Sequence, residues 1–370
     1  MSNIEKYLES YLKNYKPYKG EMKWNYEDGC TLVGVEKMYM ATGDKKYYDF
    51  IYDYMNKRID DNGKISEFSL TEYNIDNINS GKVLFNLYKE TKNEKYRKAM
   101  EEVYYQLKIQ PRTLAGGFWH KSRYPYQVWL DGLYMSLPFY AQYETEFNNM
   151  EKYSDVFKQF KNVRDLMYSE EYGLYYHGYD ETKMMNWANK ETGLSPNFWL
   201  RSIGWLAMAL IDTIEVMNEQ IFEYHRELQK IFKELIKGIL KYQNQSGLWY
   251  QVMGKEDEKG NYLESSGTLM FSYAILKGVR LGFLPEEYLE NGKKAFEGTI
   301  EKYLVEENGE TKLKGICIMA GLNGIVSFNG DRDGSYEYYL SEPVGEDDPK
   351  GTGPLMMAYS EILMINNKKL

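Results

Sequence analysis

The sequence predicts an all-α fold, a single-domain (α/α)6 barrel that spans residues 1–370 and carries short aromatic strands and a long C-terminal loop. One alternation along the chain is the main evidence. Six segments that are apolar on nearly every side alternate with six amphipathic segments rich in Lys and Glu. A helix that is apolar all round must be buried, whereas a helix with one polar face lies at a surface. The alternation therefore predicts an inner ring of six helices enclosed by an outer ring of six, each repeat contacting its neighbours.

The inner helices are expected to begin at small residues, which let the chain turn tightly and let a ligand approach the backbone. These beginnings lie at residues 28–32, 80–85, 131–135, 201–206, 266–271 and 351–356. The outer helices are predicted at residues 6–15, 47–58, 95–108, 153–167, 224–242 and 287–304. Short aromatic strands are predicted in equivalent connections at residues 117–120, 173–177 and 247–251. Residues 321–353 are the longest irregular stretch, which predicts a functional loop over one end of the barrel.

The composition excludes several classes of function. The 370 residues carry a formal net charge of −9 and no basic block, which argues against a nucleic-acid partner. The chain begins without a basic and apolar leader, and no apolar stretch is long enough to cross a bilayer. We therefore expect a cytoplasmic protein without a membrane partner. Cys30 and Cys317 lie far apart in apolar surroundings and are expected to be buried free thiols.

Motifs for several other chemistries are absent from the sequence. It has no phosphate-binding Gly-x-x-x-x-Gly-Lys-Ser/Thr loop, no His-Glu-x-x-His pair and no Gly-x-Ser-x-Gly nucleophile elbow. Three scattered histidines and two distant cysteines give no zinc set, so no metal and no cofactor are expected. The acidic run at residues 346–348 precedes a proline and is expected to be solvated.

Two aspartates stand where inner helices are predicted to begin. Asp76 lies just before the second inner helix, and Asp131 lies at the start of the third. In an (α/α)6 barrel the beginnings of the inner helices surround one mouth, so polar residues there are candidates for a pocket. The alternative is that each aspartate is a helix N-cap, a role that Asp favours. Spacing alone slightly favours the N-cap.

Other polar residues lie among aromatic ones in the central third of the chain. His120 and His177 fall in matching aromatic strands, whereas His225 lies in an outer amphipathic helix and is expected at the surface. Arg201 lies between Trp199 and Trp205, where a charge is costly unless something pairs with it. Its partner would be a buried carboxylate or a substrate anion held by the guanidinium. Five of the seven tryptophans gather in this third, which favours a site over a plain core: Trp119, Trp129, Trp187, Trp199 and Trp205.

With these residues the chain resembles the unsaturated rhamnogalacturonyl hydrolases, glycoside hydrolase family 105. The likeness covers most of the chain in the right order and lies in residues 74–78, 116–121, 129–135, 199–205 and 332–343. The block Trp-Leu-Asp-Gly-Leu-Tyr-Met is its most specific part. The resemblance implies the same barrel, with Asp131 in the position of the catalytic aspartate and Asp76 in that of its assisting carboxylate. It also implies a set of pocket-lining residues: His120, Lys121, Met135, His177, Trp199, Arg201 and Trp205.

The resemblance further implies an unsaturated oligosaccharide as substrate. Family members act on sugars whose terminal uronic acid carries a C4=C5 double bond left by a polysaccharide lyase, and they hydrate that bond. Asp131 would then give a proton to C4 and take one from the water that adds at C5. It must hold a proton near neutral pH, which burial among Trp129 and Tyr134 and a negative Asp76 would favour and the helix N-terminus would oppose. Either Arg201 or Lys121 would hold the substrate carboxylate.

Several alternatives stay open on the sequence. An unsaturated glucuronyl hydrolase shares this chemistry and differs in the leaving sugar. A conventional inverting glycosidase would split the acid and base roles between two carboxylates. A sugar epimerase would use His120 and His177 as an acid/base pair. A helical-repeat interaction protein would not be an enzyme, and it leaves the tryptophans around Asp131 unexplained. The oligomeric state is not predicted.

Overall fold

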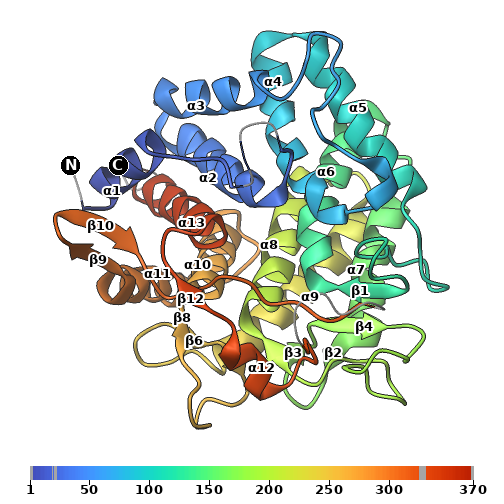
Figure 1. Ribbon diagram of the computed structural model, residues 1–370, viewed down its shortest axis with the longest axis vertical. Coiled ribbons are helices and arrows are strands. Elements are labelled where there is room, and N and C mark those ends of the chain that lie inside the picture. Colours follow the sequence, from blue (N-terminus) through green and yellow to red (C-terminus); the bar gives the residue numbers. More distant parts are fainter. Residues whose placement is uncertain (1–2, 19, 21–22, 325–330, 368–370) are drawn as a thin grey trace.

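The computed structural model describes residues 3–18, 20, 23–324 and 331–367, and its helices form two concentric layers (Figure 1). Each inner helix packs on the next one along the chain, and the last packs on the first, which closes the ring. The inner helices are α2 (Tyr26–Thr42), η2 (Ile75–Val83) continued by α4 (Leu84–Thr91), α6 (Leu130–Phe147), α8 (Leu200–Val216), α10 (Ser265–Arg280) and α13 (Pro349–Asn367). The predicted (α/α)6 barrel is confirmed.

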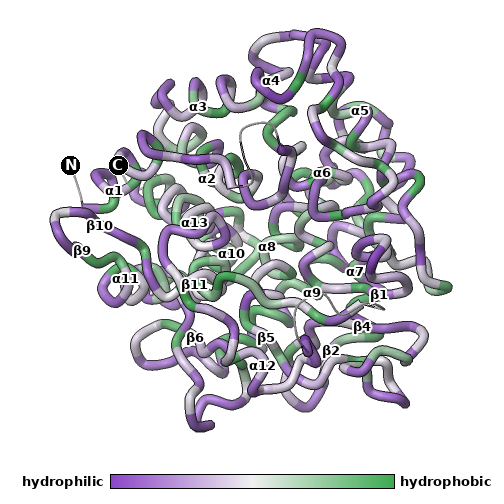
Figure 2. The backbone as a smooth tube through the Cα atoms, viewed as in Figure 1, coloured by the Kyte–Doolittle hydropathy of each residue, from purple (hydrophilic) through white to green (hydrophobic). Residues whose placement is uncertain are grey.

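The outer helices lie within a few residues of their predicted ranges. They are α1 (Asn3–Lys13), α3 (Lys45–Asn56), α5 (Glu94–Ile109), α7 (Tyr153–Met167), α9 (Phe222–Leu240) and α11 (Leu289–Tyr303). Figure 2 shows why the layers separate, because hydrophobic residues gather on the inner helices and hydrophilic residues lie mostly at the periphery. Two short 3-10 helices, η1 (Leu70–Glu72) and η3 (Glu286–Tyr288), lie in the connections. No helix in the described part of the chain has the length and apolar character needed to cross a membrane.

The expected surface position of His225 is wrong. Its side chain is buried on the inner face of α9, with Nε2 3.2 Å from the Ile214 carbonyl of α8 and Nδ1 2.9 Å from the amide of Gln229. An amphipathic helix buries the residues that face its neighbour, and the ring of His225 is on that face. Both cysteines are buried and free, as predicted, and burial raises the pKa of the Cys30 thiol to about 12.

The strands of the described residues form antiparallel pairs. They are β1 (Gln127–Trp129) with β4 (Gly178–Asp180), β2 (Tyr168–Ser169) with β3 (Leu174–Tyr175), β5 (Phe198–Trp199) with β7 (Val252–Met253), β6 (Trp249–Tyr250) with β8 (Leu263–Glu264), β9 (Leu304–Glu307) with β10 (Glu310–Leu313), and β11 (Ile316–Cys317) with β12 (Val344–Gly345). In register, Trp129 lies opposite Gly178 and Trp199 lies opposite Val252. Strands β1, β5 and β8 run directly into α6, α8 and α10, so each pair fixes where an inner helix begins.

Two of the three predicted aromatic strands are present, as β3 and β6. The prediction for residues 117–120 is wrong, because this segment makes only a single bridge, between Phe118 and Arg112. The backbone of its last residue instead forms two hydrogen bonds to other segments. His120 N donates to Gln127 O at 2.9 Å, and His120 O accepts from Ile75 N at 3.2 Å. This segment therefore joins the start of η2 to the strand before α6.

The predicted irregular stretch at residues 321–353 is more ordered than expected. It contains α12 (Tyr336–Ser341), β12 and the first turn of α13, while residues 325–330 lie outside the described part of the chain. Its acidic run is not simply solvated, because Asp347 accepts from the backbone N of Leu313 at 2.9 Å and the buried Asp348 pairs with Lys350 at 2.7 Å. Asp348 also accepts from the backbone N of Lys350, and so caps the beginning of α13.

Candidate active site

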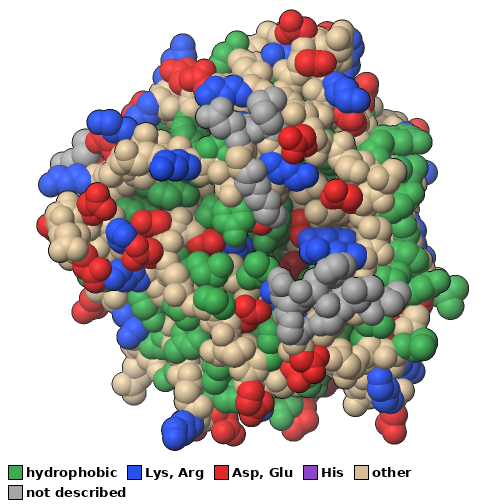
Figure 3. All heavy atoms as spheres, in the orientation of Figure 1, with side chains coloured by type: hydrophobic (Ala, Val, Ile, Leu, Met, Phe, Trp, Pro, Cys, Tyr) green, Lys and Arg blue, Asp and Glu red, His purple; other side chains and the backbone are tan. Residues whose placement is uncertain are grey.

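The beginnings of the inner helices meet at one mouth of the barrel, as the fold predicts. Figure 3 shows a face of the molecule with a hollow near its middle, acidic side chains within the hollow and a basic side chain at its edge. The side chains that carry the candidate chemistry come from η2, from the segment before β1, from α6 and from the segment between β3 and β4.

Asp131 is the second residue of α6 and does not cap the helix. The N-cap position is Trp129, whose side chain makes no capping bond. The Asp131 side chain is 15% exposed, and its Oδ2 lies 3.2 Å from Nε2 of His177. That oxygen is buried and accepts no hydrogen bond from any described residue. The N-cap alternative therefore does not explain Asp131.

Asp76 lies in the first turn of η2 and does not cap it either. The cap is Asn74, whose side-chain oxygen accepts from the backbone N of Asp76 at 3.3 Å. Asp76 Oδ2 pairs with Nζ of Lys121 at 2.6 Å, and Oδ1 lies 3.5 Å from Nε2 of His120. Burial acts to raise the pKa of Asp76, but His120 and the Lys121 ammonium outweigh burial and hold that pKa below its ordinary value. Asp76 is therefore a paired carboxylate at neutral pH.

The two histidines flank the indole of Trp129. The His120 ring stacks on Trp129 with centroids 4.3 Å apart, and the His177 ring meets the same indole edge to face at 5.5 Å. Nδ1 of His177 lies 2.8 Å from the hydroxyl of Tyr339, and its ring is 4.8 Å from Trp199. Burial lowers the pKa of His120 to about 4, against the opposing effect of the acidic neighbours, so its imidazole is neutral near pH 7.

Four buried polar atoms of this site lack a hydrogen-bond partner among the described residues. They are Asp76 Oδ1, His120 Nδ1, Asp131 Oδ2 and His177 Nε2. Leaving such atoms unpaired costs roughly 1–3 kcal/mol each, so native proteins rarely gather them without a ligand or water to satisfy them. Their concentration around one indole marks the place where a polar ligand would bind.

The sequence left two partners open for Arg201, a buried carboxylate or a substrate anion, and the structure shows the buried carboxylate. Its side chain is buried on α8, where Nη1 donates to the carbonyl of Cys317 and to Ser266 Oγ at 3.2 Å. The buried carboxylate of Glu264, which caps α10, lies 4.0 Å away. Burial opposes the charge, but these neighbours keep the pKa of Arg201 above its ordinary value. Arg201 Nε is still without a partner among the described residues.

The structure brings together Asp76, His120, Lys121, Asp131, His177 and Trp199. It places Met135 and Trp205 elsewhere, in the main hydrophobic core, where Trp205 stacks on Tyr134 with centroids 5.0 Å apart. Sequence reasoning missed Tyr339 of α12, which contacts His177, because its place is set by a contact over 162 residues of sequence. The signal that could have found it is the run of tyrosines within the late segment at residues 332–343.

Beside the paired Asp76 lies a polar cavity of about 300 Å³. Lys121 forms part of its wall, and so does Arg123, two residues further along the chain. Arg123 is exposed and makes no ion pair with any described residue, and its guanidinium lies 4.9 Å from the ring centroid of Tyr124. Sequence reasoning missed this cation, which is free to meet a negative group on a ligand. Within the described residues, no three His, Cys, Asp or Glu side chains gather closely enough to hold a metal ion.

The low pKa of His120 predicts acid sensitivity of the fold. An unfolded histidine has a pKa of 6.5, so between pH 6.5 and about 4 the unfolded chain binds a proton that the folded chain does not. The free energy of unfolding should therefore fall as the pH is lowered through this window, by about 3 kcal/mol from His120 alone. Melting curves from pH 7 to 4 should show a shallower decline for His120→Gln than for the wild type. An equal decline in melting temperature for both proteins would contradict the low pKa of His120 in the folded state.

Comparison with known proteins identifies the family. The family model described as Glycosyl Hydrolase Family 88 matches residues 3–366. A solved Clostridium acetobutylicum glycoside hydrolase from family 105 is 44% identical, over 97% of this chain and 98% of that one, with a TM-score of 0.90. An unsaturated rhamnogalacturonyl hydrolase of Bacillus subtilis, YesR, is 24% identical over 78% of this chain and 79% of its own. The fold is also that of an unsaturated glucuronyl hydrolase from Bacillus sp. GL1, at 14% identity over 92% of this chain and 86% of that one, with a TM-score of 0.62. The chain thus belongs to the unsaturated uronyl hydrolases of glycoside hydrolase families 88 and 105.

Proposed function

We propose that this hydrolase releases the terminal 4,5-unsaturated galacturonic acid from lyase-generated rhamnogalacturonan oligosaccharides by hydrating the C4=C5 double bond, with Asp131 as general acid and base. The observation that carries the proposal is the contrast between the two aspartates. Asp76 forms a salt bridge with Lys121 at 2.6 Å, whereas Asp131 pairs with no described Lys or Arg and faces only the ring of His177, at 3.2 Å. One carboxyl group is thus available for proton transfer at this mouth.

The reaction needs only that one group. Asp131 gives its proton to C4, and the positive charge that develops at C5 is stabilised by the ring oxygen. Water then adds at C5 and returns a proton to the Asp131 carboxylate, which restores the acid. The hemiketal formed at C5 opens by breaking the bond between C5 and the ring oxygen, which leaves a ketone at C5 and a hemiacetal at C1. The hemiacetal then releases the leaving sugar as an alcohol.

The surroundings of Asp131 support this sequence of steps. His177 lies 3.2 Å from its carboxylate and is oriented by Tyr339 on its other nitrogen, so it would hold the carboxyl and the attacking water in place. The pairing of Asp76 with Lys121 keeps Asp76 a carboxylate, so its negative charge is fixed at this mouth. A conventional inverting glycosidase would need a second free carboxylate across the sugar ring. The Lys121 pairing argues against Asp76 in that role.

The choice between rhamnogalacturonyl and glucuronyl substrates depends on the leaving sugar. Galacturonic and glucuronic acids differ only at C4, and that difference disappears when a lyase makes C4 trigonal. Selectivity must therefore come from contacts beyond the unsaturated ring. The name of the Bacillus subtilis relative supports rhamnogalacturonan fragments, whereas the glucuronyl hydrolase shares the fold alone.

The test is to follow the ultraviolet absorbance of the conjugated double bond in two unsaturated disaccharides, one with rhamnose and one with glucosamine as the leaving sugar. The absorbance should decay with both and fastest with rhamnose. A saturated disaccharide of the same sugars should not be cleaved. Decay with neither disaccharide would overturn the proposed chemistry, and a preference for glucosamine would overturn the substrate class.

Arg123 gives a prediction about longer substrates. Rhamnogalacturonan alternates uronic acid and rhamnose, so a tetrasaccharide carries a second carboxylate two sugars from the double bond. The Arg123 guanidinium, which makes no ion pair with a described residue, lies at the wall of the 300 Å³ cavity and is a suitable partner for it. Arg123→Ala should raise KM for the tetrasaccharide about five-fold and leave KM for the disaccharide unchanged, since an ionic hydrogen bond of this kind is worth about 1 kcal/mol at an exposed site. Equal effects on both substrates would exclude this role.

A further inference from the structure

Pro138 interrupts α6, the inner helix whose first turn carries Asp131. Proline has no N–H, so the carbonyl four residues earlier, that of Tyr134, has no donor within the helix. A proline at such a place also bends the helix and uncouples the turns on its two sides. The first two turns of α6, which include Asp131, must therefore be held by contacts from outside the helix.

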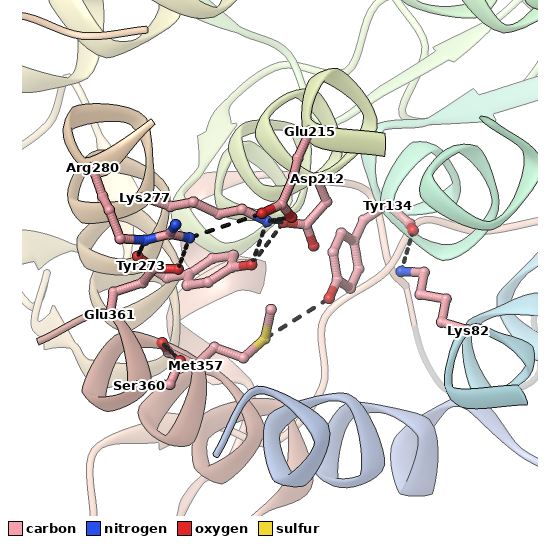
Figure 4. A network of polar contacts seen from close by, with 10 residues as sticks. All are labelled: Lys82, Tyr134, Asp212, Glu215, Tyr273, Lys277, Arg280, Met357, Ser360 and Glu361. Carbon is pink, nitrogen blue, oxygen red and sulfur yellow. Dashed lines mark hydrogen bonds and ion pairs between the residues drawn. The ribbon is translucent and has the colours of Figure 1, made fainter. Parts of the chain in front are cut away.

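Lys82 supplies the missing donor. Its Nζ lies 2.7 Å from the carbonyl oxygen of Tyr134 and 3.3 Å from the centroid of the Tyr134 ring (Figure 4). The side chain is 7% exposed, and no described carboxylate lies within ion-pair distance of its Nζ. Burial lowers the pKa of Lys82 to about 7. A buried lysine without an acid partner is unfavourable unless its donors are used, and here the free carbonyl of α6 uses one.

The neighbouring ion pairs have a different character. Lys277 of α10 pairs with both Asp212 and Glu215 of α8 at 2.6 Å, and Arg280 pairs with Glu361 of α13. These ion pairs join one inner helix to another. Figure 4 shows them grouped on the α8, α10 and α13 side of the core. Lys82 stands apart across the Tyr134 ring and bonds to backbone instead.

Tyr134 connects this bond to the rest of the inner ring. Its ring stacks on Trp205 of α8, and its hydroxyl lies 3.8 Å from the sulfur of Met357 in α13. Lys82 belongs to η2, the element that begins next to Asp76. One hydrogen bond therefore joins the element that carries Asp76 to the helix that carries Asp131.

We propose that Lys82 is a positioning residue: through the Tyr134 carbonyl that Pro138 leaves free, it fixes the first turns of α6 and so sets Asp131 relative to Asp76. This inference rests on the proposed function, in which Asp131 must keep a fixed distance from the double bond and from the charge of Asp76. It makes no use of substrate contact by Lys82, whose side chain is buried.

The test uses the proline to undo the loss of the lysine. Lys82→Met removes the donor and should lower kcat about ten-fold or more with a smaller change in KM, because sub-ångström displacement of a catalytic group has effects of this size. Pro138→Ala restores an N–H for the Tyr134 carbonyl, so the Lys82→Met/Pro138→Ala double variant should recover most of that loss. Pro354 also lies inside a described helix, α13, and Pro354→Ala is the matched control. It should not rescue Lys82→Met.

The same variants should be melted in parallel, and kcat should be measured against pH. A purely structural lysine would lower the melting temperature and leave kcat and its pH dependence unchanged in the folded variant, which would overturn the proposal. Rescue by Pro354→Ala equal to that by Pro138→Ala would overturn it as well. If Lys82→Met does not fold alone, kcat is compared between the two double variants, Lys82→Met/Pro138→Ala and Lys82→Met/Pro354→Ala. If the wild type hydrolyses no unsaturated sugar, the proposed function fails, whereas a melting-temperature coupling specific to Lys82 and Pro138 would still establish the bond.

Discussion

Asp131→Asn is expected to lower kcat by about 1,000-fold, the size of effect that follows when a general acid and base is lost. Asn has nearly the same shape, so the contact with His177 and the start of α6 should survive. It cannot deliver a proton to C4 or accept one from water. The measurement is the decay of the double-bond absorbance under saturating substrate, with circular dichroism and a melting curve to verify the fold.

The matched control is Asp44→Asn, the same chemical change at a helix beginning on the outside of the barrel. Asp44 caps α3 by accepting from the backbone N of Lys46 at 3.0 Å. Asn can accept the same bond, so this change should leave the melting temperature nearly unchanged and kcat unchanged. An Asp131→Asn variant as active as this control would remove Asp131 from the chemistry.

Asp76→Asn is expected to lower kcat by about 100-fold, because the site loses a fixed negative charge and gains an unpaired ammonium at Lys121. The low pKa of Asp76 means that this charge is present throughout the neutral range. The measurement is kcat from the decay of the double-bond absorbance under saturating substrate.

Lys121→Met in the Asp76→Asn background separates charge from shape. The double variant has neither charge of the pair, so its kcat should return part of the way toward that of the wild type. A kcat in the double variant no higher than in Asp76→Asn would show that Asp76 only orients its neighbours. Melting curves verify that both variants keep the fold, since removing one partner of a buried pair is itself destabilising.

The sequence predicts the barrel well, because the distinction between inner and outer helices depends on local periodicity alone. It predicts less about side chains that long-range contacts position. His225 lies in an amphipathic segment of the sequence, but its side chain packs against α8. The acidic run at residues 346–348 is expected to be solvated, but Asp348 caps α13 and Asp347 accepts a hydrogen bond from the backbone of Leu313. In both cases the partner is an element that the local pattern does not reveal.

The candidate site also contains features that the local pattern predicts and others that depend on long-range contacts. The positions of Asp76 and Asp131 at helix beginnings follow from the repeat, and the structure rejects the N-cap alternative because Asn74 and Trp129 occupy the cap positions. The contact of Tyr339 with His177 could not be predicted, since it joins segments 162 residues apart. Met135 and Trp205 lie in the same sequence blocks as the site residues but point into the core, because successive residues of a helix face different directions.

The most direct test of the central claim is to run the reaction in D2O and examine the product by NMR at early times, before the ketone exchanges its neighbouring hydrogens. Hydration of the double bond by Asp131 predicts one deuterium at C4, placed on a single face of the sugar, together with a ketone at C5. A product that retains its double bond and carries no deuterium at C4 would mean direct attack at the anomeric carbon, and would contradict the account.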